Sequence, residues 1–301
     1  MLKDLAELKS GKYGDFIENE AMKNQTTFKV GGPCDLLMRP KDEKEIRDIV
    51  LYCKENDIPL TLLGNGSNVL VRDKGIRGVV IKFDKNFNEI SIDGEYLTAQ
   101  AGALLSTASK TSFAESLEGM EGLSGIPGSV GGAIYMNAGA YGTEIKDVAY
   151  SVRCMDLDGN IHEFNNEEMD FGYRHSTVSE KDLICLTATF KLKKGNYEEI
   201  MARFKDFDYK RTSKQPLEKH SAGSTFKRPE GYFASKLIDD AGLRGYTYKR
   251  AQVSEKHCGF LINMDDATFD EVMGLITRVQ DIVKEKFGVT LETEVKIIGE
   301  E

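Results

Sequence analysis

The chain has 301 residues, of which 40% are hydrophobic and 30% charged, and its formal net charge is −9. This length allows two or three domains with their own cores, and the acidic balance disfavours non-specific nucleic-acid binding, which needs a basic surface. The charged, amphipathic N-terminus is unlike a signal peptide and no apolar run could span a membrane, so we expect a soluble, cytoplasmic protein.

The cysteines and histidines form no recognisable metal or disulfide pattern. The five cysteines are widely spaced, without a Cys-x-x-Cys pair, and the four histidines lack metal-ligand spacing. This usage is typical of reduced, mostly buried thiols in a cytosolic protein. We therefore expect no metal site.

The first quarter of the chain predicts a β-α-β unit. Residues 27–32 and 35–40 look extended, and residues 58–63 form a short buried strand. The helix between them should begin near Asp42 and bury one face, made of Ile46, Ile49, Val50 and Cys53.

A glycine loop follows that strand at once and consists of Gly64, Asn65, Gly66, Ser67 and Asn68. A strand that runs into such a turn is a usual place for a phosphate cradle. The loop is not a Rossmann fingerprint, because Val69 stands at the third glycine position, and no Gly-Lys-Ser/Thr marks a Walker loop. Residues 69–71 then resume the extended pattern.

From residue 78 to about residue 195 the pattern is that of antiparallel strands. Residues 79–83, 89–92 and 96–99 read as strands, and residues 182–192 as a later one. Asp93-Gly94 and Asp158-Gly159 each separate alternating runs and predict two hairpins. A helix is expected over residues 104–117.

The run over residues 125–142 is rich in glycine and contains no charged residue. Glycine lets a backbone lie directly against a ligand, so the run is typical of main-chain N–H groups around a phosphate. The alternative is a tight loop between packed elements. Two uncharged glycine loops together favour a dinucleotide with a pyrophosphate, bound by a fold other than the Rossmann fold.

The last third predicts helices over residues 197–209, 233–241 and 268–287, and a terminal strand over residues 289–298. The helix over residues 268–287 should end at Gly288 and bury a stripe made of Phe269, Val272, Met273, Ile276, Val279, Ile282 and Val283.

Three short stretches, far apart in the sequence, carry side chains suited to chemistry. Arg174 lies among aromatic and small residues without an adjacent acidic partner, and its planar fork suits a carboxylate or phosphate. Ser224 follows a glycine, and Glu294 shares one strand face with Glu292. Taken singly, each has an ordinary explanation: a solvated arginine, a serine that satisfies a turn, and the wet face of a strand.

Taken together, these motifs resemble a known family. Val30-Gly31-Gly32, the first glycine loop and residues 122–133 are followed by Tyr173-Arg174-x-Ser176, by Ala222-Gly223-Ser224-x-Phe226 and by residues 294–299. In this order the set is similar to the UDP-N-acetylenolpyruvoylglucosamine reductases, also called UDP-N-acetylmuramate dehydrogenases. The chain between Ser176 and Asp182 is short, so it resembles the subgroup that lacks the tyrosine loop; Lys296 departs from the arginine that is frequent in the family.

The resemblance implies an α+β fold of the vanillyl-alcohol-oxidase/PCMH type, with two FAD-binding subdomains and a C-terminal α+β substrate-binding domain. The expected boundaries are residues 1–78 with 289–301, residues 79–195, and residues 196–288. Non-covalent FAD would lie against the first glycine loop and against the second, at Gly125, Gly128, Ser129, Gly131 and Gly132.

The resemblance also implies the reaction. With NADPH as reductant, the enolpyruvyl group of UDP-N-acetylglucosamine enolpyruvate would be reduced to UDP-N-acetylmuramate, a precursor of peptidoglycan. Arg174 would bind the substrate carboxylate, protonated Glu294 would donate a hydrogen bond to it, and Ser224 would protonate the α-carbon, with Lys227 or Arg228 as candidates to support its alkoxide.

Substrate binding is expected at three further residues. Basic residues gather at positions 209–216, shortly before Ser224, and suit a diphosphate; the resemblance points to Arg211 and Lys214 among them, and the alternative is a solvated helix end. Asn137 lies within the second glycine run. We expect a monomer. Two alternative functions remain at this stage: a related FAD-dependent oxidase of the same fold, and a non-catalytic protein that binds FAD or a nucleotide sugar.

Overall fold

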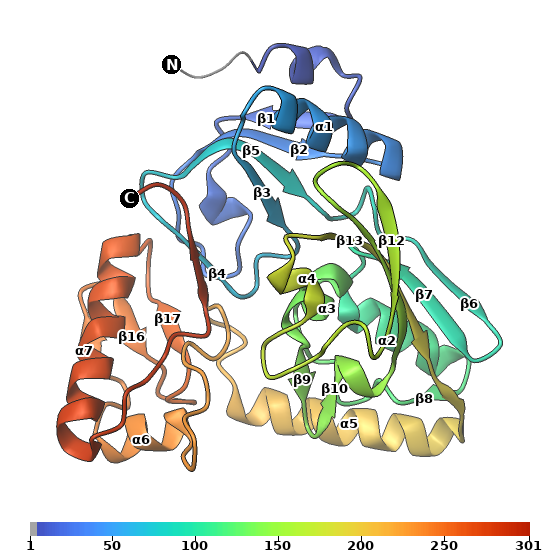
Figure 1. Ribbon diagram of the computed structural model, residues 1–301. Helices are drawn as coiled ribbons and strands as arrows, with labels where there is room; N and C mark the ends of the chain where they lie inside the picture. Colours follow the sequence, from blue (N-terminus) through green and yellow to red (C-terminus); the bar gives the residue numbers. More distant parts are fainter. Residues whose placement is uncertain (1–4) are drawn as a thin grey trace. The chain divides into compact units, whose positions relative to one another are not determined.

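The computed structural model describes residues 5–301 (Figure 1), so the first four residues of the amphipathic N-terminal segment lie outside the described part. The chain divides into two compact units. The first contains Met1–Glu18, Leu36–Asn65 and Gly78–Lys210, and the second contains Asn19–Asp35, Gly66–Arg77 and Arg211–Glu301. The expected division into three domains stays a prediction.

The first unit contains two sheets. The strand order in one is β1-β2-β5-β3, and in the other β12-β11-β13-β7-β6. The strands are β1 (Asp15–Glu18), β2 (Cys34–Arg39), β3 (Leu60–Leu63), β5 (Ile76–Lys82), β6 (Ile90–Asp93), β7 (Tyr96–Gln100), β11 (Ala149–Met155), β12 (Ile161–Asn165) and β13 (Ile184–Lys191). Strands β3 and β5 are parallel, whereas the second sheet is antiparallel throughout.

Four helices and two short strand pairs complete this unit. The helices are α1 (Glu43–Glu55), α2 (Leu105–Ala114), α3 (Val130–Met136) and α4 (Thr177–Glu180), and α5 (Tyr197–Lys214) begins in it. The short pairs are β8 (Leu117–Glu118) with β14 (Lys193–Lys194), and β9 (Gly139–Ala140) with β10 (Thr143–Glu144). There are also 3-10 turns at Glu7–Ser10 and Ile145–Asp147.

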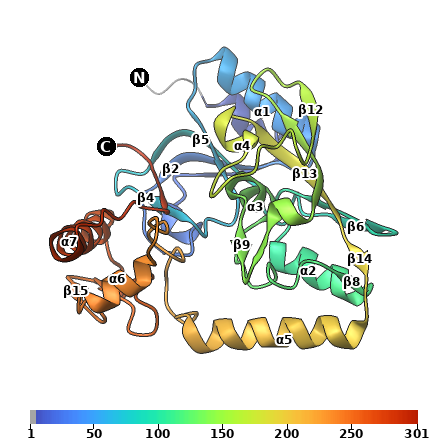
Figure 2. The same cartoon turned by 60° about the horizontal axis from the view of Figure 1, so that its bottom comes forward.

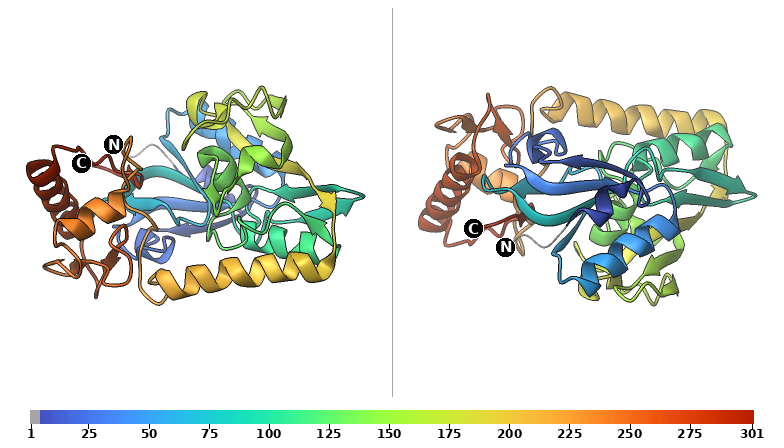
Figure 3. Two further views of the ribbon diagram at one scale, coloured as in Figure 1. Left: turned by 90° about the horizontal axis from the view of Figure 1, so that it is seen from below. Right: turned by 90° about the horizontal axis from the view of Figure 1, so that it is seen from above.

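Helix α1 shows how local sequence sets the packing of the first unit. The Asp42 carboxylate caps the helix by accepting a hydrogen bond from the Glu45 N–H at 2.8 Å. The four expected positions of its buried face are all 1% exposed or less, and they share one core with residues of β2 and β5. Figure 3 shows the ribbon of the chain from below and from above. The prediction for this helix is confirmed.

The second unit has a separate core, built around α7 (Phe269–Phe287). Its other elements are a 3-10 turn (Met22–Asn24), β4 (Val69–Val71), α6 (Ala234–Asp240), β15 (Thr247–Tyr248), β16 (Ala251–Val253), β17 (Leu261–Asn263) and β18 (Lys296–Ile298). Figure 2 shows α6, α7 and β15 of this unit. Thr268 caps α7 at its start, and Gly288 ends it in the left-handed conformation at φ 69°, as predicted. Of the expected stripe, Met273 and Ile282 are only partly buried.

Some expected elements differ. Residues 27–32 form no strand, because Lys29 at φ 57° and Gly31 at φ 134° break the extended path. The terminal strand is shorter than expected and comprises only β18, which pairs in parallel with β4. Helix α2 ends before residue 117, since Ser116 at φ 56° turns the chain into β8. Helix α5 continues past Tyr209 to Lys214.

Across residues 5–301, none of the helices is both long enough and apolar enough to cross a membrane.

Candidate active site

The two glycine loops meet in the first unit. Strand β3 ends at Leu63, and the next residue, Gly64, lies so close to Ser129 that a Cβ atom would be 2.2 Å from its Oγ. The Asn65 side chain donates a hydrogen bond to the Pro127 carbonyl at 2.5 Å. The two glycine loops therefore contact each other, through residues 64–65 of the first and residues 127–132 of the second, although about sixty positions separate them.

The second loop leads into α3. The Ser129 hydroxyl caps this helix by accepting from the Gly132 N–H at 3.3 Å. At Gly131 an added Cβ would lie 2.9 Å from the Cβ of Ala101, so packing explains that glycine. At Gly132 a Cβ would meet only the Ser129 Oγ, at 3.5 Å. Packing within the chain therefore does not require glycine at position 132, which fits close approach of a ligand.

The remaining expected loop residues have different surroundings. Gly66 belongs to the second unit, has φ 66°, and an added Cβ would lie 2.4 Å from the Gln25 carbonyl. Ser67 and Gly125 are half-buried, and the Gly128 carbonyl accepts from the Leu105 N–H at 3.0 Å.

Sequence reasoning did not identify Lys82, whose side chain contacts the first glycine loop. Lys82 ends β5 and is only 6% exposed, and its Nζ donates to the Gly64 carbonyl at 2.6 Å. A lysine directly after the apolar run Val79-Val80-Ile81 was the available signal. Its hydrogen bond holds the carbonyl at the start of the loop and places a cation there.

A cavity of about 240 Å³ in the first unit borders the first glycine loop. Its lining includes Asn65 of the first loop and Gly102, Ala103 and Leu104. The Ala103 carbonyl in turn accepts from the Val130 N–H at 2.7 Å, next to Ser129. Main-chain groups, a buried ammonium and a cavity fit a dinucleotide cofactor such as FAD.

In the second unit, Asn68 and Glu294 are joined directly. The Asn68 side chain donates to the Glu294 carbonyl at 3.3 Å, and the Lys296 N–H donates to the Asn68 carbonyl at 3.0 Å. The end of the first glycine loop is thus bonded to a predicted catalytic residue 226 positions away. No local sequence signal predicts this pairing.

Ser224 and Glu294 are also brought together. The Glu294 N–H donates to the Thr225 carbonyl at 2.8 Å, and Phe226 and Thr293 form a β-bridge. This pairing replaces the strand that was expected to continue through residues 291–295. Ser224 is exposed, Glu294 is half-buried and Glu292 is exposed.

The two cations proposed to support Ser224 have other contacts. The Lys227 ammonium lies 3.0 Å from a carboxylate oxygen of Glu292, and the Arg228 guanidinium lies 4.0 Å from the centre of the Phe233 ring. Both residues belong to the second unit, as does Ser224.

Arg174 belongs to the first unit, at the tip of a tight turn. Gly172 and His175 exchange backbone hydrogen bonds of 3.2 and 3.3 Å, and Arg174 adopts φ 56° between them. The guanidinium lies 4.9 Å from the centre of the Tyr173 ring. Asn137, which was expected to bind substrate, is 1% exposed and hydrogen-bonds to the Gly172 carbonyl.

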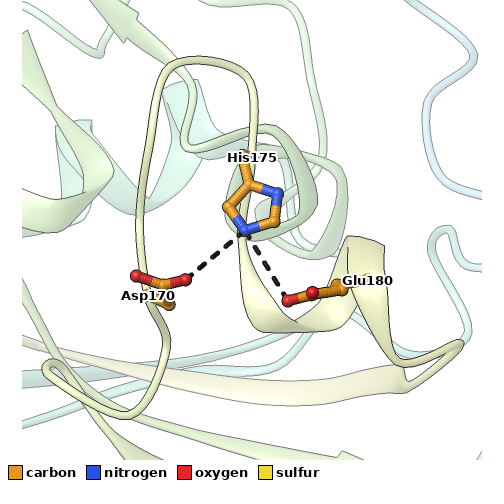
Figure 4. A group of neighbouring side chains, drawn as sticks. All are labelled: Asp170, His175 and Glu180. Atoms are coloured by element: carbon orange, nitrogen blue, oxygen red, sulfur yellow. Dashed lines mark ion pairs between the residues drawn. The ribbon is translucent and has the colours of Figure 1, made fainter.

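Beside Arg174, the His175 ring lies between two carboxylates, as Figure 4 shows. Its Nε2 is 3.7 Å from Asp170 and 3.9 Å from Glu180. Within residues 5–301 this is the one group of three such side chains close enough together to hold a metal ion. Both carboxylates are exposed, and the expectation of no metal stays a prediction.

Arg211 and Lys214 lie in the last turn of α5. Arg211 Nε donates to the Gln215 side chain at 3.3 Å, and Lys214 is exposed. The Lys256 ammonium donates to the Thr212 carbonyl at 2.7 Å and adds a third cation to this helix end.

Known proteins resemble the chain over nearly its whole length. Residues 34–165 match the family described as "FAD binding domain", and residues 215–298 match "UDP-N-acetylenolpyruvoylglucosamine reductase, C-terminal domain". A UDP-N-acetylenolpyruvoylglucosamine reductase of Clostridioides difficile is 51% identical, over 95% of this chain and 94% of that protein. One from Caldanaerobacter subterraneus is 50% identical, over 96% and 95%.

A solved structure agrees. The crystal structure of UDP-N-acetylenolpyruvylglucosamine reductase from Thermus caldophilus is 34% identical, with a TM-score of 0.81 over 94% of this chain and 98% of that one. The expected α+β FAD-binding fold with a C-terminal substrate-binding domain is confirmed. The chain belongs to the family of UDP-N-acetylenolpyruvoylglucosamine reductases.

Proposed function

We propose that Arg174, Ser224 and Glu294 are the catalytic residues of this chain. As a member of its family, it is an FAD-dependent oxidoreductase that uses NADPH to reduce the enolpyruvyl group of UDP-N-acetylglucosamine enolpyruvate to UDP-N-acetylmuramate, in peptidoglycan precursor synthesis. The observation that carries the proposal is the backbone pairing between residues 224–226 and 293–294, because it gathers two candidate groups on neighbouring segments.

The glycine loops are the proposed cofactor site. Gly64, Asn65 and Lys82, with the main chain of residues 125–132, would hold the FAD phosphates on the first unit, and Gly66, Ser67 and Asn68 would do so on the second. When it is bound and reduced by NADPH, FAD supplies the hydride that adds to the β-carbon of the enolpyruvyl group. The free, buried thiol of each cysteine fits non-covalent binding.

Arg174 is proposed to hold the substrate carboxylate. Addition of a hydride to the β-carbon places negative charge on the α-carbon and the carboxylate, and a guanidinium stabilises that charge as it forms. A protonated Glu294 would donate a further hydrogen bond to the same carboxylate. These contacts strengthen in the transition state and so raise the rate rather than only the affinity.

Ser224 is proposed to give its hydroxyl proton to the α-carbon. A serine hydroxyl is a weak acid, so the alkoxide that forms needs a nearby positive charge. Lys227 is the better placed of the two candidates, because its ion pair with Glu292 is exposed and so is readily exchanged. Arg228 is instead stacked on Phe233.

Arg211 and Lys214 complete the proposal on the substrate side. Arg211 and Lys214 would bind the diphosphate of the sugar nucleotide, and the nearby Lys256 contact to α5 supports a basic patch at that helix end. We further infer that the chain works as a cytoplasmic monomer; the reduced cysteines support the compartment. Light scattering of the purified protein would test the monomer against its mass of 33.6 kDa.

A spectroscopic assay tests the function. The purified protein should be yellow and should oxidise NADPH only when UDP-N-acetylglucosamine enolpyruvate is added. Rapid NADPH oxidation with O₂ alone would favour the related oxidase, and a flavin that NADPH does not reduce would favour a non-catalytic binding protein.

A further inference from the structure

We propose that Asn137 is a positioning residue that aims Arg174, rather than a residue that touches the substrate. The inference rests on the proposed role of Arg174 and replaces direct substrate binding by Asn137 with an indirect action. It is carried by contacts within the first unit, from the end of α3 to the turn at residues 172–175.

The hydrogen-bonding groups of the Asn137 side chain are already used. Nδ2 donates to the Gly172 carbonyl at 2.9 Å and to a Glu144 carboxylate oxygen at 3.0 Å, and Oδ1 accepts from the Lys146 N–H at 3.0 Å. An amide has two N–H donors, so none is left for a ligand. With 1% exposure, the side chain would have to leave all three partners to reach a substrate.

The turn that carries Arg174 depends on this contact. Arg174 adopts the left-handed conformation at φ 56°, which is strained for a non-glycine residue and persists only when its surroundings hold it. On one side of the turn, the Asn137 amide holds the Gly172 carbonyl. On the other, the Ser176 hydroxyl donates to the Tyr135 carbonyl at 3.0 Å.

Both ends of the turn are therefore fastened to the last residues of α3, on either side of Met136. Ser176 is fully buried and also caps the short helix α4. Ser176 of the Tyr-Arg-x-Ser motif thus has a structural role, because it holds one end of the turn. Asn137 holds the other end.

Glu144 is the second acceptor of the Asn137 amide. Hydrogen bonds from Lys146 and Asn137, together with the charges of Lys146 and Arg174, lower the pKa of this carboxyl. Glu144 also forms an ion pair with Lys146, whose ammonium lies 2.9 Å from its carboxylate. The same asparagine thus bonds both the turn that carries Arg174 and the carboxylate of this ion pair.

The variant Asn137→Gly tests the proposal with least disturbance. Asn137 itself has φ 41°, which glycine adopts without strain, whereas alanine would add backbone strain to the loss of the amide. Asn86→Gly is the matched control, because the Asn86 amide also donates to one backbone carbonyl (Arg39) and one carboxylate (Asp15) in the same unit.

Two readouts apply to the flavin-loaded protein. The first is the Kd of UDP-N-acetylglucosamine enolpyruvate for oxidised enzyme, measured by calorimetry without NADPH. The second is the rate at which this substrate reoxidises the NADPH-reduced enzyme. We expect Asn137→Gly to raise the Kd and to slow reoxidation by about 10- to 100-fold, with flavin content and the rate of reduction by NADPH unchanged. Asn86→Gly should change neither readout.

A double-mutant cycle with Arg174→Ala identifies the route of the effect. If Asn137 acts through Arg174, the double variant is no worse than Arg174→Ala alone. Additive losses would show that Asn137 acts on the substrate independently, which overturns the inference while leaving the role of Arg174 intact. An Asn137→Gly protein that binds and reacts like the wild type would also overturn it. A harmless Arg174→Ala would overturn both the inference and the proposed function of Arg174.

Discussion

Gly132 is the glycine of the second loop whose replacement gives the clearest test of FAD binding. Substitution of Gly66 or Gly131 by valine would disturb the chain itself, since an added Cβ meets neighbouring atoms at 2.4 and 2.9 Å. At Gly132, in the first turn of α3, an added Cβ would lie 3.5 Å from the Ser129 Oγ, the nearest atom outside the backbone of the helix itself. Alanine favours a helix over glycine by about 0.5–1 kcal/mol, so Gly132→Ala should not destabilise the apoprotein.

We therefore expect Gly132→Ala to lower FAD affinity while the thermal midpoint of the apoprotein stays the same or rises. Fluorescence titration with FAD and a thermal melt of the apoprotein measure the two effects. Lys110→Ala, at an exposed position of α2, is the control for a generic helix substitution. Unchanged FAD affinity in Gly132→Ala would mean that Gly132 does not contact FAD and that this part of the loop is only structural.

Lys82 gives a second test. Replacing it by methionine keeps most of the buried volume but leaves the Gly64 carbonyl without its charged donor. A hydrogen bond to a charged group contributes about 1.5–3 kcal/mol, so we expect Lys82→Met to weaken FAD binding by about 10-fold or more. The measurement is the FAD Kd of the refolded apoprotein. Equal affinity in the variant and the wild type would exclude support of the loop by Lys82.

These residues also show what sequence can reveal about a site. Arg174, Ser224 and Glu294 could be proposed as site residues from the sequence, because they lie in short motifs, and their roles stay predictions. The contacts of Asn68 with Glu294 and of Asn137 with Gly172 could not, because each joins segments that only the tertiary fold brings together. Asn137 was expected to face substrate since nothing local shows that its amide is already bonded.

Among the helices, α1 and α7 could be read from sequence because capping residues and a periodic apolar face agree with each other. The chain after α7 was misjudged for the opposite reason. Alternating residues at 289–298 satisfy a strand pattern, but residues 292–294 bond to residues 225–227 instead, and only β18 joins β4. Which partner a short extended segment finds depends on the whole unit.

The contacts of Glu271 at the start of α7 predict that the free energy of unfolding depends on pH. Hydrogen bonds from the Arg250 side chain lower the pKa of Glu271, and its carboxylate also accepts from the Thr268 N–H at 3.1 Å. A carboxyl with a lowered folded-state pKa adds stability above its unfolded pKa of about 4.3, and that stability is lost as the pH falls through the folded-state pKa. Arg250 is partly exposed, so we expect about 1 kcal/mol.

Urea unfolding of Glu271→Gln and of the wild type, at pH 7 and at pH 3, measures this contribution. The variant should be less stable at pH 7, and the difference should shrink at pH 3. Glu285→Gln, at an exposed position near the end of the same helix, should behave like the wild type. A difference that does not depend on pH would mean that the Glu271 charge contributes nothing.

Over the whole chain, the proposed chemistry draws on both compact units. Arg174 comes from the first, Ser224 and Glu294 come from the second, and the first glycine loop contributes residues to each. Each unit has its own core, so a substitution at a site residue in one should leave the packing of the other intact.

The most direct test of the proposed catalytic residues is stopped-flow absorbance at the flavin band, with Ser224→Ala and Arg174→Ala beside the wild type. Reduction of the bound flavin by NADPH should proceed at nearly the wild-type rate in both variants. Reoxidation by UDP-N-acetylglucosamine enolpyruvate should fall by about 10²–10⁴-fold in Ser224→Ala, as expected on removal of a general acid, and should also fall in Arg174→Ala. If Ser224→Ala slows reduction as much as reoxidation, Ser224 is structural and the proton comes from another group.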